Sequence, residues 1–294
     1  MIDNIKFFVL DKERFERDLK NNPLIDLKTS VSVSTGDYTE EYPKVAKHHN
    51  LEIRITKTTA YVKGSIHKYY NSIIGLGNHN YNDFSYRQWE IAINTLCEDL
   101  NIFKEHTRIT NLEYGFNLEC DFDPKELVEK LALMYNYKDH NRKHRFNGKG
   151  YYKEFEMTDY SLKIYDKSKQ YNLADKKLTR IELKIIKARC LSSLGIVTLQ
   201  EMTNHTFRGL FKRFLYCFNR ILIIDSLKPP KDVRIDLMVL FTTCTNPNLW
   251  ESLSYEDKLS QKRDFKKLIK KYSYDKVHTQ LRDKILSKYH KLIK

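Results

Sequence analysis

The sequence predicts an α+β fold in which helices flank an antiparallel sheet and a mainly helical, basic region follows. Apolar and polar residues alternate in 51–63, 108–120 and 178–187, which is typical of half-buried strands. Residues 85–103 instead place apolar side chains at helical spacing, which predicts an amphipathic helix.

The middle of the chain adds a helix, a loop and two strands. Asp123-Pro124 predicts a helix start, because aspartate is a good cap and proline suits the first helical position. We expect that helix to carry Leu127, Leu131 and Met134. An exposed basic loop at 138–150 and strands near 151–157 and 160–168 are expected next.

The pattern changes near residue 190. Residues 198–226 are expected to be helical, and 255–293 to form two basic amphipathic helices. We therefore divide the chain into an α+β domain, 1–190, and a helical region, 191–294.

A strong positive charge narrows the class of partner. The chain has 294 residues, with 52 Lys and Arg against 38 Asp and Glu, which gives a formal charge of +14. This balance favours a polyanion such as nucleic acid or an anionic membrane surface. No apolar run is long enough to span a membrane, and the first residues do not match a signal peptide. The five cysteines are widely spaced and include no Cys-x-x-Cys pair, so we expect reduced thiols in a cytoplasmic protein.

The strands also carry polar residues on the face opposite their apolar one, because side chains alternate across a strand. Near 160–168, Leu162 and Ile164 are expected to point inward, and the polar side chains outward. If the strands share a sheet, this polar face combines carboxylates, cations and a phenol, which could bind a divalent metal and a phosphate. Ordinary cross-strand pairs on an exposed face are the other interpretation, and the pattern alone favours it. The residues concerned are Glu52, Glu113, Tyr165, Lys167, Arg180 and Glu182.

Four segments carry a resemblance to a known family. They are NLEYGFNLE, SLKIYDKSKQ, LTRIELKI and KARCLSSLGI, in that order along the chain. Over roughly residues 1–200 the chain resembles rolling-circle replication initiators, namely the gene II/X proteins of filamentous phages and the Rep_trans proteins of small plasmids.

The resemblance implies that 1–190 is a DNA-nicking domain with an antiparallel-sheet nuclease core. We expect the basic helical region 191–294 to bind DNA, with a plain solvated charged face as the other interpretation. A tyrosine would attack a backbone phosphate, forming a 5′-phosphotyrosyl intermediate and a 3′-OH primer. It further implies Mg²⁺ or Mn²⁺ as cofactor, DNA as partner, host helicase and polymerase, and a possible homodimer. By position, Tyr165 matches the nucleophile, Glu113 the acidic residue of the preceding strand motif, Arg180 and Glu182 the R-x-E pattern, and Glu52 is a weaker match. From their chemistry, Glu113 and Glu182 could hold the metal, and Lys167 and Arg180 could stabilise the phenolate or the phosphate.

Two further segments are candidates for DNA contact. The stretch 65–86 combines aromatic, histidine and amide residues that suit base stacking and hydrogen bonding. It could equally be a Gly/Asn-rich connection, or supply a histidine metal ligand. The loop at 138–150 is basic enough to contact phosphate, although a plain solvated loop is also possible. The candidates are His67, Lys68, Tyr69, Asn78, His79, Asn80, Arg142, Lys143 and Arg145.

Two other functions stay open at this point. One is a DNA-binding regulator without catalytic activity, and the other is a mobilisation relaxase or a transposase-like nickase. The chain has no His-x-His triplet, which disfavours the nickase class that binds its metal that way. Participation of a second tyrosine also stays open, with Tyr151, Tyr152, Tyr160 and Tyr171 near the candidate nucleophile.

Overall fold

The computed structural model describes residues 1–29, 41–140, 151–231 and 233–294. These residues form two compact units, each made of several chain segments. Unit 1 comprises Met1–Gly115, Leu183–Lys212 and His290–Lys294, and unit 2 comprises Phe116–Glu182 and Arg213–Tyr289. The functional division near residue 190 stays a prediction.

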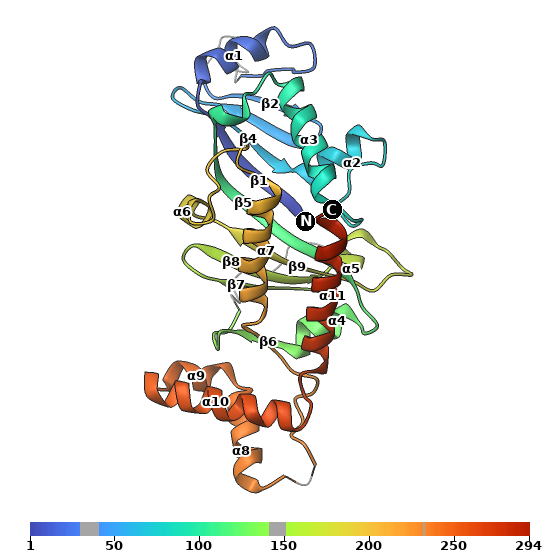
Figure 1. The fold of residues 1–294 in the computed structure, drawn as a ribbon, viewed down its shortest axis with the longest axis vertical. Coiled ribbons are helices and arrows are strands. Elements are labelled where there is room, and N and C mark those ends of the chain that lie inside the picture. The colour runs from blue at the N-terminus through green and yellow to red at the C-terminus, as the bar shows by residue number, and fades with distance from the viewer. Residues whose placement is uncertain (30–40, 141–150, 232) are drawn as a thin grey trace, which may run out of the picture. The chain divides into compact units, whose positions relative to one another are not determined.

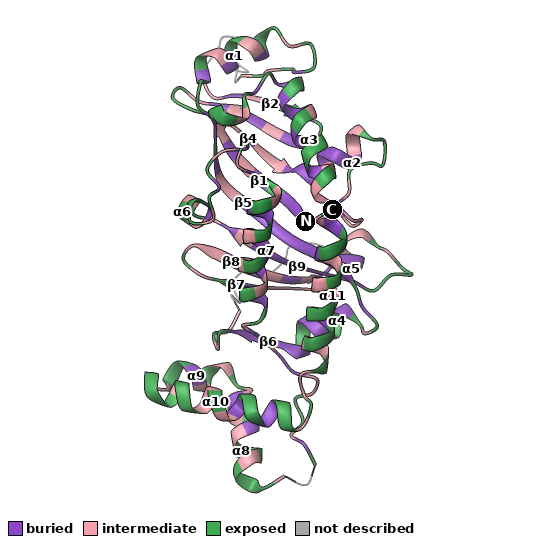
Figure 2. Cartoon of the chain, in the orientation of Figure 1, coloured by how far each residue is buried: buried purple, intermediate pink, exposed green. Residues whose placement is uncertain are grey.

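Unit 1 is built on antiparallel strands in the order β2-β3-β4-β1-β5 (Figure 1). One face of these strands supplies the core, with Phe7, Ile53 and Val62 fully buried. Buried and partly exposed residues alternate along β3 and β4 (Figure 2), as the period of a half-buried strand requires. The strands are β1 (Ile2–Val9), β2 (Lys44–His48), β3 (Leu51–Ile55), β4 (Ala60–Ser65) and β5 (Thr107–Glu119).

The single strand expected over 51–63 is a hairpin, so that expectation is wrong. The Thr56 backbone N–H donates to the Thr59 carbonyl at 2.7 Å, and this turn reverses the chain between β3 and β4. Alternation continues on both sides of a short turn, and this is why the pattern did not reveal the reversal.

The helices of unit 1 begin at side-chain caps. Asp11, Ser65 and Ser85 each accept a backbone N–H at the start of a helix, and Ser85 forms a full capping box with Gln88. The helix expected over 85–103 is confirmed as α3, which buries Trp89 against the core. The helical elements are α1 (Lys12–Lys20), α2 (Ile66–Ile73), α3 (Tyr86–Asp99), η1 (Lys104–His106) and α6 (Ala188–Ser192).

Unit 2 continues with β7 (Tyr152–Glu156), β8 (Tyr160–Asp166) and β9 (Leu178–Ile185). These strands agree with the three expected there. The eight main strands belong to one antiparallel sheet in the order β2-β3-β4-β1-β5-β9-β8-β7, and helices accompany it. The predicted α+β class is therefore confirmed.

Two helices predicted from the sequence are shorter than expected. After the Asp123 cap, α4 (Pro124–Glu126) and the π-helical turn η2 (Leu127–Leu131) end at Ala132, and Met134 lies on β6 (Ala132–Tyr135). In the later segment α7 (Asn204–Phe218) is followed by β10 (Ile221–Ile223). β6 and β10 pair with each other, and this long-range pairing overrides the local helical pattern.

The basic helices predicted over 255–293 are confirmed as α10 (Tyr255–Lys271) and α11 (Lys276–Leu292). Before them lie α8 (Ile235–Cys244) and α9 (Pro247–Ser252). In unit 2, α8, α9 and α10 enclose a small apolar core that contains Phe241, Trp250 and Phe265 (Figure 1). Across the described residues, no helix is both long and apolar enough to cross a membrane. The five cysteines, all of them described, form no disulfide.

Candidate active site

Tyr165 stands near the end of β8, where cross-strand pairing places it opposite Tyr152 of β7. Its neighbours Ile164 and Leu162 are fully buried, whereas the Tyr165 side chain keeps partial access to solvent. The Tyr165 hydroxyl donates to Glu182 Oε2 at 3.2 Å. A carboxylate that accepts the hydrogen bond of an accessible phenol is placed to act as a general base toward it.

Two positively charged side chains contact the Glu182 carboxylate. Glu182 lies on β9, is only 3% exposed, and accepts Arg180 Nε at 2.6 Å and Lys163 Nζ at 3.2 Å. Arg180 also donates Nη1 to Asn117 Oδ1 at 3.0 Å, which fixes its guanidinium. Arg180 and Glu182 share a strand face because they are two residues apart.

The burial of these groups excludes an ordinary exposed polar face. Glu113, Lys167, Arg180 and Glu182 are between 1% and 7% exposed. Burying charge is costly unless each group is paired, and clusters of buried charge concentrate at functional sites. The ordinary interpretation expected an exposed face, and these residues are buried instead. The cross-strand pairs that it expected are present, as in Lys163–Glu182 and Lys184–Glu113.

Lys167 does not lie on the strand face where it was expected. The Asp166 carboxylate accepts the Lys169 N–H at 2.9 Å and caps α5 (Lys167–Tyr171), so the strand ends one residue before Lys167. Lys167 nevertheless remains beside the tyrosine. Its Nζ lies 5.3 Å from the centroid of the Tyr165 ring, within the range of a cation–π contact.

Two carboxylates of unit 1 form a second feature. Asp3 and Glu113, on β1 and β5, are buried, and each offers an oxygen within 4.8 Å of the other. Like charges this close repel one another, and hard divalent cations prefer oxygen ligands of this kind. The donor set therefore fits a divalent metal ion.

Asp3 is the acidic residue that the sequence analysis missed. The β1–β5 register shifts between Ile2 and Ile5, so strict alternation does not reveal which way Asp3 points. Within the fold its carboxylate accepts hydrogen bonds from the Ser65 hydroxyl and, at 2.5 Å, from Asn80 Nδ2. Such partners fix the orientation of a metal-binding carboxylate.

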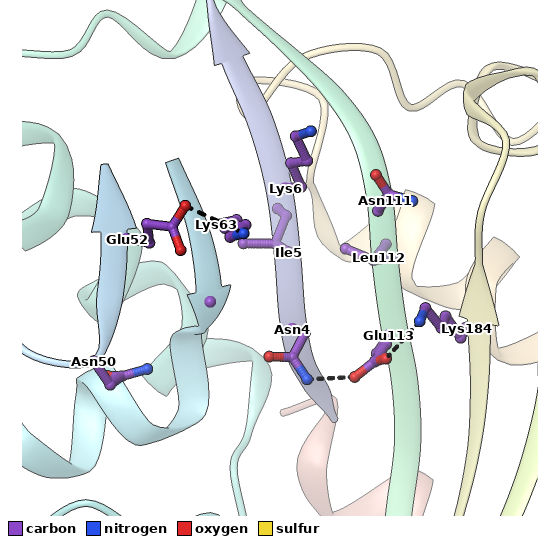
Figure 3. A pocket seen from close by; sticks show the side chains of 11 residues that line it. Asn4, Ile5, Lys6, Asn50, Glu52, Lys63, Asn111, Leu112, Glu113 and Lys184 are labelled. Atoms are coloured by element: carbon purple, nitrogen blue, oxygen red, sulfur yellow. Dashed lines mark hydrogen bonds and ion pairs between the residues drawn. The ribbon is translucent and has the colours of Figure 1, made fainter. Parts of the chain in front are cut away.

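Glu113 and Glu52 line one open pocket of unit 1, with a volume of about 430 Å³ (Figure 3). Glu113 accepts a hydrogen bond from Asn4 and lies 4.0 Å from Lys184 Nζ. Glu52 forms an ion pair with Lys63 at 3.2 Å.

Half of the DNA-contact candidates in 65–86 are buried in unit 1. His67 Nε2 lies 2.7 Å from Asn82 Oδ1, and its ring stacks on Phe84. Tyr69 is fully buried and donates to Asp99 Oδ2 at 2.9 Å. Asn80 holds Asp3, as described above.

The remaining candidates of that segment are accessible. Asn78 is exposed, and Lys68 and His79 are partly exposed. The His79 ring stacks on Tyr81 with centroids 4.0 Å apart, and burial lowers the pKa of His79. The basic-loop candidates Arg142, Lys143 and Arg145 lie outside the described residues.

The other tyrosines near the site have different partners. Tyr152 donates to Glu154, and the hydroxyls of Tyr160 and Tyr135 lie 2.8 Å apart. Burial raises the pKa of both Tyr152 and Tyr160 above the ordinary value. Tyr171 lies beneath Lys167 Nζ, 5.0 Å from its ring centroid.

Comparison with known proteins gives no match in sequence and a weak match in structure. No family model matches the chain, and no curated protein sequence matches it. Among solved structures, the chain is similar to a rolling circle replication initiator protein from Geobacillus stearothermophilus, with a TM-score of 0.45 and 11% identity. The similarity covers 84% of this chain and 96% of that one. At this level of similarity the match assigns no function.

Proposed function

We propose that the protein initiates rolling-circle replication by nicking one DNA strand at an origin, with Tyr165 as the nucleophile. The observation that carries this proposal is the hydrogen bond from the Tyr165 hydroxyl to Glu182, a carboxylate that also binds Arg180 and Lys163. The pattern SLKIYDKSKQ followed by LTRIELKI, which resembles that of rolling-circle initiators, supports the same assignment.

The proposed nicking reaction exchanges bonds and protons only among Tyr165, Glu182, the DNA and solvent water. Tyr165 Oη attacks a backbone phosphorus, and a new P–O bond forms while the bond from phosphorus to the 3′-oxygen breaks. Glu182 accepts the phenolic proton, and the departing 3′-oxygen takes a proton from solvent. The products are a 5′-phosphotyrosyl link and a free 3′-OH, and the covalent link conserves the phosphodiester for later rejoining.

Positively charged side chains would stabilise the negative charge that develops in this reaction. Arg180 presents a planar donor suited to phosphate oxygens, and Lys163 and Lys167 lie on either side of the tyrosine along the chain. Preorganised cations of this kind act most strongly where water is largely excluded.

Asp3 and Glu113 would hold Mg²⁺ or Mn²⁺, and Glu52 would act as a weaker neighbour. A divalent ion bound there would polarise a phosphate oxygen and offset its charge. Asn80 and Ser65 would keep Asp3 oriented toward that ion. Metal binding by Glu182 stays a prediction.

DNA binding would rest on the basic surface. The formal charge of +14 and the lysine-rich helices α10 and α11 suit sequence-tolerant phosphate contacts. Lys68, Asn78 and His79 are the accessible candidates in 65–86. Arg142, Lys143 and Arg145, the host helicase and polymerase, and a homodimer stay predictions.

The deciding experiment is nicking of a supercoiled plasmid that carries DNA flanking the gene, in Mg²⁺ or Mn²⁺. We expect Tyr165→Phe to abolish nicking, whereas Tyr152→Phe, on the neighbouring strand, keeps it. Mass spectrometry of protein trapped on the nicked strand should find the phosphotyrosyl link on Tyr165.

Two results would overturn the proposal. If Tyr165→Phe nicks as well as the parent, the nucleophile is another residue. If the unsubstituted protein shifts DNA mobility but never nicks it, the DNA-binding regulator is the correct function.

A further inference from the structure

The solvent-facing side of the unit 1 strands carries two ordered rows of side chains. Cross-strand pairing places Arg54 opposite Tyr61, Tyr61 opposite Phe8, and Phe8 opposite Arg108, across β3, β4, β1 and β5. This first row has two aromatic rings at its centre and an arginine at each end. The opposite faces of the same strands are buried in the core, whereas the residues of this row are partly or fully exposed.

The second row runs beside the first. Here Glu52 lies opposite Lys63, Lys63 opposite Lys6, and Lys6 opposite Asn111. Figure 3 shows these four side chains around the pocket that Glu113 also lines. Along β1 the order is Phe8, Lys6 and then Asn4, and Asn4 donates to Glu113.

Two lysines directly opposite each other on neighbouring strands are unfavourable in the protein alone. Glu52 pairs with Lys63 at 3.2 Å, but that ion pair is partly exposed and leaves Lys6 as additional positive charge. The Lys6 ammonium instead lies over the Tyr61 ring, with its Nζ 4.2 Å from the centroid. An anion seated between Lys6 and Lys63 would relieve the repulsion.

The two rings lie where a base could reach them. Phe8 and Tyr61 are partly exposed and meet edge to face, with centroids 5.7 Å apart. Exposed rings next to cations are the arrangement that binds unpaired bases and their phosphates. A duplex hides its base faces in its own stack, so rings of this kind select a single strand.

We propose that this face binds single-stranded DNA, with bases stacked on Phe8 and Tyr61 and phosphates held by Lys6 and Lys63. The strand would then continue along β1 toward Asn4 and Glu113. This inference rests on the proposed function for its biological meaning, because a nickase must present one strand to its nucleophile.

The test measures binding without chemistry. Full-length protein with Tyr165→Phe, in a chelator, is titrated into a fluorescent single strand and into the matching duplex. Adding Phe8→Leu and Tyr61→Leu should weaken single-strand binding about tenfold or more, since each base stack contributes substantially, and should leave duplex binding nearly unchanged. Phe103→Leu is the matched control. Phe103 is an exposed ring with an arginine, Arg14, stacked on it, but it lies before η1 and not on any of the four strands.

A conservative exchange and a salt titration make the test more specific. Phe8→Tyr with Tyr61→Phe keeps both rings and should restore binding. Lys6→Gln and Lys63→Gln should each reduce the slope of log affinity against log salt by about 0.7. Lys57→Gln, in the exposed turn between β3 and β4, should not.

Crosslinking gives an answer that does not depend on a variant folding. Irradiation of the protein with a bromodeoxyuridine strand should attach DNA to peptides of β1 and β4. Equal loss of single-strand and duplex binding in the leucine variant, unchanged single-strand binding, or crosslinks only elsewhere would overturn the inference. None of these outcomes depends on whether Tyr165 is the nucleophile, which the nicking assay decides separately.

Discussion

Two tyrosine–glutamate pairs lie on adjoining strands of unit 2 and have different surroundings. Tyr165 donates to Glu182, and Tyr152 donates to Glu154, with the two rings 6.2 Å apart. Glu182 also binds Arg180 and Lys163, whereas Glu154 accepts the Ser161 hydroxyl.

The two pairs differ in one cation. Burial, and then the hydrogen bond to Glu154, raise the pKa of Tyr152 above its ordinary value, although the charge of Lys163 opposes this rise. Lys163 lies opposite Glu154 and also binds Glu182, so it is near both pairs. Arg180 binds Glu182, and it would offset the charge of a Tyr165 phenolate and of the phosphate it attacks. We therefore expect Arg180, and not a nearby carboxylate alone, to distinguish Tyr165.

Replacing each glutamate with glutamine in turn tests this difference most directly. Glu182→Gln keeps the shape but removes the proton acceptor, so we expect nicking to fall about 10²- to 10⁴-fold. Glu154→Gln should leave nicking close to that of the parent. Both are measured on a supercoiled plasmid, with DNA binding as the control. Equal losses in the two variants would contradict the distinction between the pairs.

Metal binding tests the same distinction among carboxylates. Asp3 lies beside Glu113, whereas Glu52 forms an ion pair with Lys63. We expect Asp3→Asn to weaken Mn²⁺ binding about tenfold or more, with a much smaller effect of Glu52→Gln. Isothermal titration calorimetry measures both. A larger effect at Glu52 would place the ion elsewhere in the pocket.

A third tyrosine–carboxylate pair has a structural role. Tyr69 is fully buried and donates to Asp99, which also lies 2.8 Å from His48 Nε2. Tyr69→Phe should lower the free energy of unfolding by about 1 kcal/mol, the usual net value of one hydrogen bond. Urea unfolding measures this, with exposed Tyr255→Phe as the control. Lost DNA binding at unchanged stability would instead support the DNA contact predicted for Tyr69.

The fourth pair, Tyr42 and Glu16, also has lysine partners, and the carboxyl group of Glu16 has a shifted pKa. Burial alone would raise the pKa of Glu16, but hydrogen bonds from Lys44, Tyr42 and Lys12 outweigh burial and lower the pKa to about 2. A depressed carboxyl pKa stabilises the fold above the ordinary value of 4.5, and that stability is lost as pH falls toward 2.

Glu16→Gln should therefore narrow the difference in unfolding free energy between pH 6 and pH 3, measured in urea at both values. Glu13→Gln, exposed on the same helix, serves as the control. An unchanged difference in the Glu16 variant would mean that other carboxylates account for the acid sensitivity.

The sequence determined the elements whose signals are local. Alternation located β5, β8 and β9, helical spacing located α3, and the basic pattern located α10 and α11. The order of residues along β8 and β9 also singled out Tyr165, Arg180 and Glu182 as residues of one polar face, because strand parity depends only on neighbouring positions.

Tertiary structure decided what depends on distant partners. The β6–β10 pairing replaced predicted helix with strand, and the Asp166 cap moved Lys167 from the strand onto α5. Asp3 acquired its partners only when Ser65 and Asn80 folded beside it. The sequence could not show which tyrosines are buried or which have cations beside them either, because burial and neighbouring charge are properties of the packed chain and not of its local pattern.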